Sequence, residues 1–429
     1  MWRLSYWMLR AVSGIFFWFR RRVTPAGKVA VGIALVAAAL GVDTSQTLAY
    51  QIFALIIAAL VLGLLAARAM RPRFEVRRVA PRVVTAGQAF SYRVWVRNLG
   101  SRPADGLSYS EQTPDPRPSL GEFRGKLKWP TYRGWWRLVM QAQPADVEDA
   151  RIPPLLPGAQ VMLELRGQAR RRGTFQLTGA NVAQAEPLGL VRALARVRLP
   201  DAMVVLPRRY KLHPAQLAGA RRYQHGGVSL ANSVGDSEEF IGLRLYRPGD
   251  PLQRIHWKSF ARRGEPVVRE YQDEFFERHA LVLDTFADAR QSEAFEEAVS
   301  VAASYACTLD TQESLLDLLF VGTQAYSYTA GRGQLQTGQL VEILAGVRAS
   351  TGQRFSLLAE AVLARRGALS GCTLILLDCE AARIELVQRL RAGGVPLQIL
   401  LVSALQTPDA PAGWHHLIPG RIQEGLAAL

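Results

Sequence analysis

The stretch that decides the architecture reads LAYQIFALIIAALVLGLLAA and occupies residues 48–67. No charged residue interrupts it. At about 1.5 Å of rise per residue, a helix over this stretch covers roughly the 30 Å of a bilayer's hydrocarbon core. The stretch therefore predicts a transmembrane helix.

A second apolar run, residues 29–42, lies just before the first. It becomes long enough to span when it is extended to 25–44, with the stem of Lys28 reaching back to the headgroups. The polar residues 43–47 then form a tight turn, and residues 24–69 make a transmembrane helical hairpin. A signal peptide is the competing interpretation of the run, and it fits poorly because residues 1–28 precede the run and a full span follows it.

Basic residues flank the predicted hairpin on both sides and are absent from its turn. They are Arg20, Arg21, Arg22 and Lys28 before it, and Arg68, Arg71, Arg73, Arg77 and Arg78 after it. The positive-inside rule then places both ends of the hairpin, and all of the chain beyond residue 70, in the cytosol. We expect a protein of the bacterial cytoplasmic (inner) membrane with the bulk of its chain cytosolic.

Residues 1–23 are rich in aromatic side chains, with Arg3 and Arg10 between them. The charge-free part, residues 11–19, is too short to span a bilayer. This segment therefore predicts an amphipathic helix that lies in the plane of the membrane interface.

The overall composition excludes two classes of protein. The chain of 429 residues has 52 Lys+Arg against 36 Asp+Glu, a net charge of +16, and 49% hydrophobic residues. That is enough apolar material for two domains and an anchor, which excludes a wholly disordered chain. The three cysteines, Cys307, Cys372 and Cys379, argue against a disulfide-stapled miniprotein and a Cys-rich zinc site.

Residues 70–200 predict a β-rich module. Phe90, Tyr92, Val94 and Val96 alternate with polar residues, which is the period of a half-buried strand. Pro- and Gly-rich turns separate such runs, with no helical period of useful length, so we expect a small immunoglobulin-like β-sandwich. Residues 111–158 form a long insertion whose tryptophans, at positions 129, 135 and 136, serve either as packing or as a contact surface.

Residues 276–429 alternate predicted strands with predicted helices. The strands fall at 280–283, 315–321, 373–377 and 396–402. Crossover connections of this kind imply an α/β domain with a parallel sheet covered on both faces. Asp284 and Asp378 follow two of the strands, so both should lie at the carboxyl edge, where ligands bind in such sheets.

This arrangement resembles a von Willebrand factor A domain, whose metal-dependent adhesion site reads Asp-x-Ser-x-Ser after the first strand. Here Asp284 is kept, while Phe286 and Asp288 replace the two serines, and Asp378 matches a second acidic position. The resemblance implies two alternatives. One is a weak Mg²⁺ site on Asp284, Asp288 and Asp378. The other, which we favour, is a degenerate domain that holds no cofactor and serves as a protein-interaction platform.

Residues 201–275 contain the most distinctive block of the chain. Arg247-Pro248-Gly249-Asp250 predicts a tight turn, with Asp250 placed to cap a short helical segment after it. Ile255 and Trp257 are expected to anchor the block in a core. Seven basic residues between positions 244 and 269 meet only Asp250 and Glu265, a concentration that calls for acidic groups elsewhere in the fold or in a partner.

The same block resembles a bacterial domain-of-unknown-function family, number fifty-eight. The residues that carry the resemblance are Gly242, Arg244, Tyr246, Pro248, Gly249, Asp250, Arg254, His256, Trp257, Lys258 and Arg262. Arg172-Gly173-Thr174-Phe175 and Glu186-Pro187-Leu188-Gly189-Leu190 are similar to further motifs of the family. Members commonly carry two membrane spans and lie beside genes for MoxR-type AAA+ ATPases, so the resemblance implies an accessory or adaptor role with such an ATPase.

Three functions follow from these patterns. The first, which we favour, is a membrane-tethered adaptor, without enzymatic activity, that works with a MoxR-type ATPase on client complexes. The second is a hydrolytic enzyme in which Asp250 orients His256 as a base; the chain has no Gly-x-Ser-x-Gly, His-Glu-x-x-His or phosphate-loop motif. The third is an anion binder that uses the basic block for nucleic acid or lipid headgroups; we expect no nucleic acid because no recognised module is present.

Overall fold

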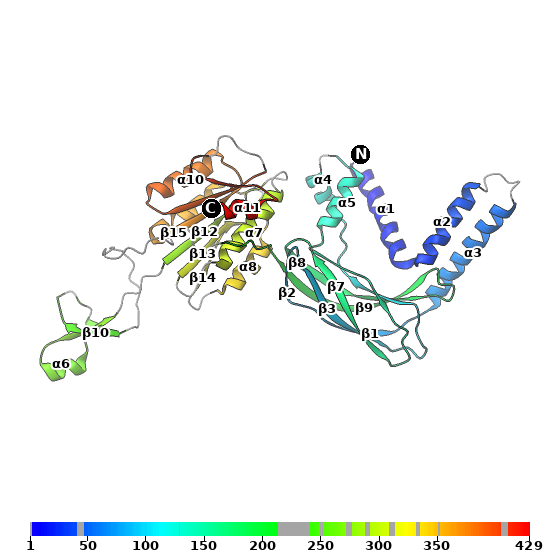
Figure 1. The fold of residues 1–429 in the computed structure, drawn as a ribbon, viewed down its shortest axis with the longest axis horizontal. Coiled ribbons are helices and arrows are strands. Elements are labelled where there is room, and N and C mark those ends of the chain that lie inside the picture. Colours follow the sequence, from blue (N-terminus) through cyan, green and yellow to red (C-terminus); the bar gives the residue numbers. More distant parts are fainter. Residues whose placement is uncertain are drawn as a thin grey trace. The chain divides into compact units, whose positions relative to one another are not determined.

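A computed structural model describes residues 2–40, 47–127, 129–212, 240–248, 250, 252–271, 277–287, 292–308, 314–331, 335–350, 352–404 and 411–429 (Figure 1). The chain divides into two compact units. The first takes in the chain up to Arg208 together with residues 342–346, and the second takes in the remainder.

The described part of the chain opens with the helices α1 (Trp2–Arg22), α2 (Pro25–Leu40) and α3 (Thr47–Ala69) (Figure 1). Residues 48–69 of α3 are long and apolar enough to cross a membrane, and only 11% of their most apolar window is buried. The 16 residues of α2 are as apolar but cover only about 24 Å. One helix therefore meets the length of a span, the second falls short, and most of the predicted turn lies outside the described residues.

The start of α2 is tied to the β-rich module. Thr24 caps the helix, its Oγ1 accepting the Gly27 N–H at 3.0 Å, and Pro25 takes the first helical position, where its missing N–H costs nothing. Thr24 also bonds outward, with its hydroxyl to the Gly189 carbonyl at 2.5 Å and its N–H to the Leu190 carbonyl at 3.1 Å. The backbones are so close that a Cβ on Gly27 would lie 2.1 Å from the Leu190 oxygen.

We name residues 186–191 the docking turn, because α2 and α3 both contact it. Glu186 is only 2% exposed, and its carboxylate accepts the N–H groups of Leu188, Leu190 and Val191 at 2.5, 2.7 and 3.2 Å. Gly63 of α3 faces this carboxylate. An alanine at position 63 would place its Cβ only 3.1 Å from Glu186 Oε1. A buried carboxylate therefore shapes the turn on which both apolar helices rest.

The middle of the chain forms two sheets, as its alternating pattern predicts (Figure 1). The order of one is β1 (Phe74–Val79), β3 (Ala89–Asn98), β7 (Gln160–Ala169) and β5 (Ala145–Val147); the order of the other is β2 (Val83–Thr85), β9 (Arg192–Leu206), β8 (Gly173–Ala185), β4 (Leu107–Gln112) and β6 (Ala150–Ile152). Inward side chains of both sheets, Val94 and Leu165 from one and Tyr109 and Val182 from the other, share one core. The module is a β-sandwich.

A buried ion pair joins the two sheets. Arg78 of β1 donates to both oxygens of Glu111 of β4, and these side chains are 1% and 4% exposed. The hydroxyls of Tyr92 and Tyr109 donate to Glu111 Oε1 at 2.7 and 2.9 Å. Burial raises the pKa of both tyrosines, so both remain protonated donors. In the folded protein Arg78 is therefore part of the sandwich core and is not an exposed flanking charge.

The insertion contains two short helices that the sequence pattern did not predict, α4 (Leu120–Lys126) and α5 (Tyr132–Gln141). Ser119 and Glu122 form a capping box at the start of α4, and Thr131 caps α5. Both helices pack on α1 around Trp135 and Phe123, which are fully buried. Trp135 thus has a packing role, whereas Trp129 is 70% exposed.

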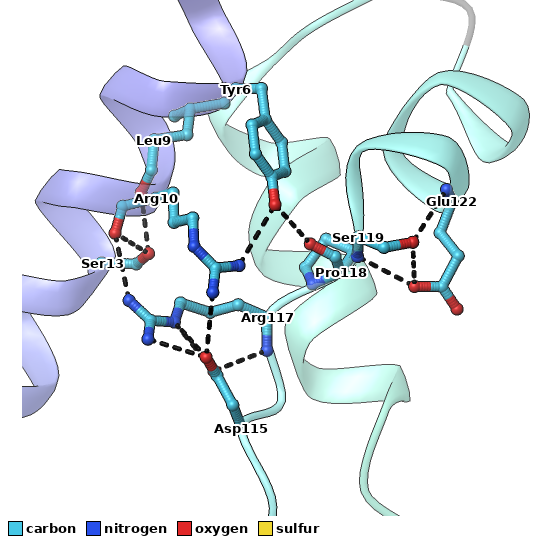
Figure 2. A network of polar contacts seen from close by, with 9 residues as sticks. All are labelled: Tyr6, Leu9, Arg10, Ser13, Asp115, Arg117, Pro118, Ser119 and Glu122. Atoms are coloured by element: carbon cyan, nitrogen blue, oxygen red, sulfur yellow. Dashed lines mark hydrogen bonds and ion pairs between the residues drawn. The ribbon is translucent and has the colours of Figure 1, made fainter. Parts of the chain in front are cut away.

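Polar contacts fasten α1 to the same insertion (Figure 2). The Tyr6 hydroxyl donates to the Pro118 carbonyl at 3.3 Å, and Arg10 reaches Tyr6 at 3.1 Å and Asp115 at 3.4 Å (Figure 2). Arg117 donates to the Asp115 carboxylate from Nε at 2.8 Å and from Nη2 at 2.7 Å. The Arg117 hydrogen bonds lower the pKa of Asp115, so this carboxylate keeps its charge at neutral pH.

The second unit contains a mostly parallel sheet (Figure 1). In spatial order its strands are β14 (Ala325–Ala330), β13 (Ser314–Val321), β12 (Glu277–Leu283), β15 (Gly371–Leu376), β16 (Leu397–Val402) and β17 (His415–Leu417), with β14 antiparallel. The helices are α7 (Ser292–Thr308), α8 (Thr337–Gly346), of which residues 342–346 are grouped with the first unit, α9 (Ser356–Leu363), the one-turn η3 (Arg366–Ala368), α10 (Ala381–Ala392) and α11 (Ile422–Ala427). Residues 280–283 of β12 are all buried, so both faces of the sheet are covered.

The contact between Gly27 and Leu190 gives a test of the docking turn. Gly27→Ala forces a Cβ against a backbone oxygen, and we expect a loss of about 1–3 kcal/mol in the free energy of unfolding. Gly32→Ala on the same helix is the matched control, because nothing lies within 4 Å of its new Cβ. Thermal unfolding of the detergent-solubilised protein measures both. Equal unfolding temperatures for the two variants would contradict the described contact.

Candidate functional site

The distinctive block folds into a small hairpin module, residues 240–271. It consists of β10 (Phe240–Leu245), the single turn η2 (Leu252–Arg254), α6 (Trp257–Arg263) and β11 (Val267–Tyr271), which pairs antiparallel with β10. The His256 N–H donates to the Val267 carbonyl at 2.8 Å, which brings α6 onto β11. Ile255, Val267 and Val268 are buried and form the apolar centre of the module.

A bidentate ion pair closes the turn of this module. Arg244 Nη1 and Nη2 lie 2.7 and 2.8 Å from the two oxygens of Asp250. The same carboxylate accepts the Arg247 N–H at 2.8 Å, and the Asp250 N–H donates to the Arg247 carbonyl at 3.0 Å. The predicted tight turn is present in the described residues. Asp250 connects the turn to β10 through its ion pair with Arg244. Sequence reasoning missed this pair because it expected Asp250 to cap the helical segment that follows.

These hydrogen bonds change the acidity of Asp250. The Arg244 guanidinium, together with the Arg247 N–H, lowers the pKa of this carboxyl from its ordinary value near 3.8 to about 2. The folded turn therefore favours the ionised form. Its stabilisation by this pair is complete above the unfolded pKa of about 3.9 and is lost as the pH falls through about 2.

His256 does not pair with Asp250. Its Nδ1 lies 2.7 Å from the Ser259 Oγ, three residues along the chain, at the start of α6. Both oxygens of Asp250 are occupied by Arg244 and Arg247, so the predicted arrangement of a carboxylate that orients a base is not formed. The hydrogen bond between His256 and Ser259 instead joins two residues at the start of α6.

The remaining residues of the block lie mostly on the surface. Trp257 is 63% exposed and packs edge-on against Phe260, so the expectation that it anchors the block in a core is wrong, while Ile255 does so. Gly242 and Tyr246 are half-buried, and the others are exposed: Pro248, Lys258 and Arg262. Gly249 and the side chain of Arg254 lie outside the described residues.

The module exposes apolar and basic side chains together. Leu245, Leu252 and Trp257 are 56%, 67% and 63% exposed. Arg247, Lys258, Arg262 and Arg269 are exposed cations within the same short module. Large exposed apolar groups that occur together mark interaction sites more often than single ones do. The surface suits a partner that offers both apolar and acidic groups.

At the edge of the α/β sheet, Asp284 and Asp378 come together as their positions predict. Asp284 follows β12 and is fully buried; its Oδ1 accepts the Phe286 N–H at 2.9 Å. Asp378 follows β15 and accepts the Glu380 N–H at 3.0 Å. Asp288, the third predicted ligand, lies outside the described residues.

A guanidinium lies between the two carboxylates. Arg383, on the first turn of α10, has its Nε 3.0 Å from Asp284 Oδ2 and 3.0 Å from Asp378 Oδ1. Its Nη1 contacts Glu380 at 2.9 Å, and its Cζ lies 4.7 Å from the centre of the Phe355 ring. Burial raises the pKa of Asp284, and the Arg383 charge opposes that shift. Arg383 thus places a positive charge of the chain itself between the two carboxylates.

No group of three or more His, Cys, Asp or Glu side chains that could hold a metal ion occurs among the described residues. Where the adhesion motif has a serine, Phe286 packs instead on Phe355, with ring centres 5.6 Å apart. Sequence reasoning missed Arg383 because 99 residues separate it from Asp284.

The titration of Asp250 tests the turn. In the wild type we expect a midpoint near 2, and in Arg244→Gln a rise toward the free value of about 3.9, which stays incomplete because the Arg247 N–H still donates to the carboxylate. Carbon-13 NMR of aspartate-labelled protein measures both midpoints. Arg269→Gln, an exposed arginine of the same module, is the control and should leave the midpoint unchanged. A midpoint near 4 in the wild type would show that the pair does not form.

The buried guanidinium gives a second test. Arg383→Met leaves Asp284 buried without its counter-charge, and we expect a loss of about 3–5 kcal/mol in the free energy of unfolding. Arg389→Met on the same helix is the control, since its pair with Glu385 is exposed and contributes about 0.5 kcal/mol or less. Urea unfolding compares the two variants. Equal urea midpoints for the two variants would show that Arg383 does not stabilise the buried Asp284.

Comparisons with known proteins place the chain among uncharacterised relatives. An uncharacterised protein of Bacillus subtilis (strain 168), YeaD, is 31% identical over 135 residues, which cover 31% of this chain and 32% of that protein. This chain therefore spans about a third of the curated relative that it matches.

Among solved structures, the CARDB domain of the PF1109 protein from Pyrococcus furiosus is similar at 14% identity, over 32% of this chain and 89% of that one, with a TM-score of 0.18. The alpha-2-macroglobulin of E. coli is similar at 13% identity, over 33% of this chain and 8% of that one, with a TM-score of 0.20. Scores this low carry no argument. Residues 242–403, from within β10 to the residue after β16, match the protein family described as "Protein of unknown function DUF58".

Proposed function

We propose that this protein is a membrane-tethered adaptor that docks an acidic, partly apolar partner, and that it works with a MoxR-type AAA+ ATPase in the assembly or maturation of client complexes. The observation that carries the proposal is the surface of the hairpin module, where Trp257 and Leu252 are exposed among cations. Tryptophan and arginine are the residues that most often dominate binding at protein interfaces. The choice of ATPase rests on the family resemblance.

Two features of the first unit support the tether. Helix α3 is long enough to span a bilayer, and α2 completes a second span if it is continued through the turn that follows it. In α1, one stripe of apolar side chains is exposed: Leu4, Trp7, Met8, Ile15 and Trp18. That stripe suits a helix lying in the interface of the inner membrane, beside arginines that hold the chain on the cytosolic side.

The α/β domain supports a platform without a metal ion. The order of its strands, with β14 antiparallel at one edge, is consistent with a von Willebrand factor A-like domain. Arg383 supplies the charge that Mg²⁺ would supply between Asp284 and Asp378. We therefore propose a degenerate adhesion domain that docks proteins without a divalent ion.

The two alternatives have weaker support. A hydrolase would need His256 to be held by a carboxylate, and its partner among the described residues is Ser259. A nucleic-acid binder would use the cations of the module, yet the exposed leucines beside them suit a protein surface better. The adaptor accounts for both the charge and the apolar groups.

A binding experiment tests the adaptor. The full-length protein in detergent is incubated with its neighbouring MoxR-type ATPase, with and without ATP. We expect the double variant Lys258→Glu, Arg262→Glu to lose about tenfold or more in affinity, because it places acidic groups against an acidic partner. The matched control, Arg151→Glu with Arg198→Glu, changes two exposed arginines of the sandwich and should bind as the wild type does. Equal binding by both variants, or no association in either nucleotide state, would exclude this docking surface.

A further inference from the structure

The first unit contains a cavity that the proposed docking function does not use. It has a volume of about 490 Å³, within the range of small-ligand sites. Its walls come from the end of α1, from α5 and from strands β4, β8 and β9. The side chains that matter for its chemistry are Arg20, Arg21, Arg192, Asp149, Asn181 and Trp136.

The cavity has an excess of positive charge. Arg117 and Arg170, which also line it, are paired with Asp115 and Asp146 at 2.7 and 3.1 Å. The other arginines of the lining, Arg20, Arg21 and Arg192, make no ion pair within 4.0 Å in the described part of the chain. Asp149 interacts with all three of these arginines, and Asp115 also interacts with Arg21.

The electrostatics of these side chains show that the charge is not balanced. Burial raises the pKa of Asp149, which weakens it as a counter-charge. Burial, together with the charges of Arg196 and Arg20, lowers the pKa of Arg21. Cations that repel one another in a partly buried site are stabilised by a bound anion.

A buried amide in the wall has no partner. Asn181, in the middle of β8, is 3% exposed, and its Nδ2 makes no hydrogen bond among the described residues. Asparagine is uncommon inside strands, and a buried donor without an acceptor costs roughly 1–3 kcal/mol. A ligand oxygen in the cavity would satisfy it.

The rim of the cavity is apolar and close in sequence to the predicted membrane helices. Phe16 and Met140 line it and are 50% and 61% exposed. Arg20 and Arg21 precede the first residue of α2, Pro25, by only a few positions. The site therefore offers cations and an amide in its wall together with exposed apolar groups, and it lies close in sequence to the apolar helix α2.

We propose that this cavity binds the phosphate headgroup of a glycerophospholipid, with Arg20, Arg21, Arg192 and Asn181 donating to the phosphate oxygens and Phe16 and Met140 contacting the start of the acyl chains. Guanidinium groups and amides are suitable donors for phosphate. The proposal concerns the first unit alone and stands whether or not the hairpin module docks a partner.

Binding of a short-chain lipid tests the proposal. Dihexanoyl-phosphatidylglycerol, kept below its micelle concentration, is titrated into the full-length protein in detergent, and tryptophan fluorescence reports on Trp136 in the cavity wall. We expect saturable binding that Arg192→Gln and Asn181→Leu each weaken about tenfold. Arg198→Gln, an exposed arginine of the same strand outside the cavity, is the matched control and should change the affinity less than about twofold.

Inorganic phosphate is titrated in parallel to separate the sources of the phosphate group. We expect it to bind much more weakly than the lipid, because it makes no contact with the apolar rim. Phosphate that binds as tightly as the lipid would overturn the lipid assignment. Binding that is absent, or that Arg198→Gln weakens as much as Arg192→Gln does, would overturn the cavity as the site. Thermal unfolding of each variant verifies that it is folded.

Discussion

The carboxylate of Glu186 is the constraint on which the arrangement of the first unit depends. Three backbone N–H groups converge on it, and they fix a turn of six residues whose carbonyls then accept from Thr24. Helices α2 and α3 are apolar, so this turn supplies polar contacts that fix the start of α2 on the sandwich, while Ala67 of α3 packs on Val191 and Ala193. The Glu-Pro-Leu-Gly-Leu motif at positions 186–190 therefore has a structural explanation, because it contacts the apolar helices α2 and α3.

The periodicity of apolar and polar side chains along the sequence predicted several of the helices and strands. The apolar run of α3, the alternation in β3 and the buried strands β12 and β15 all follow from the period of their side chains. Helices α4 and α5 could not be predicted in this way, because they are short and depend on contact with α1 through Phe123 and Trp135. A capping signal was present at Ser119 and Glu122, and it could have identified the start of α4.

The positions of the candidate site residues were predictable from the sequence, but the side chains that pair with them were not. The distinctive block marked the hairpin module, and the strand ends marked Asp284 and Asp378. The pairs that give these residues their chemistry join positions that no spacing rule connects, such as Arg383 with Asp284, or Arg78 with Glu111. Composition alone does not distinguish the roles of the arginines: some are buried in ion pairs, some line a cavity, and some remain on the surface.

The guanidinium between Asp284 and Asp378 also bears on regulation. An adhesion domain that needs a dissociable ion can be emptied by a chelator or by a fall in ion concentration, and its affinity then follows the ionic composition of the compartment. A counter-charge attached to the backbone of α10 cannot leave. This edge of the sheet thus carries one positive charge that no chelator can take away from the chain.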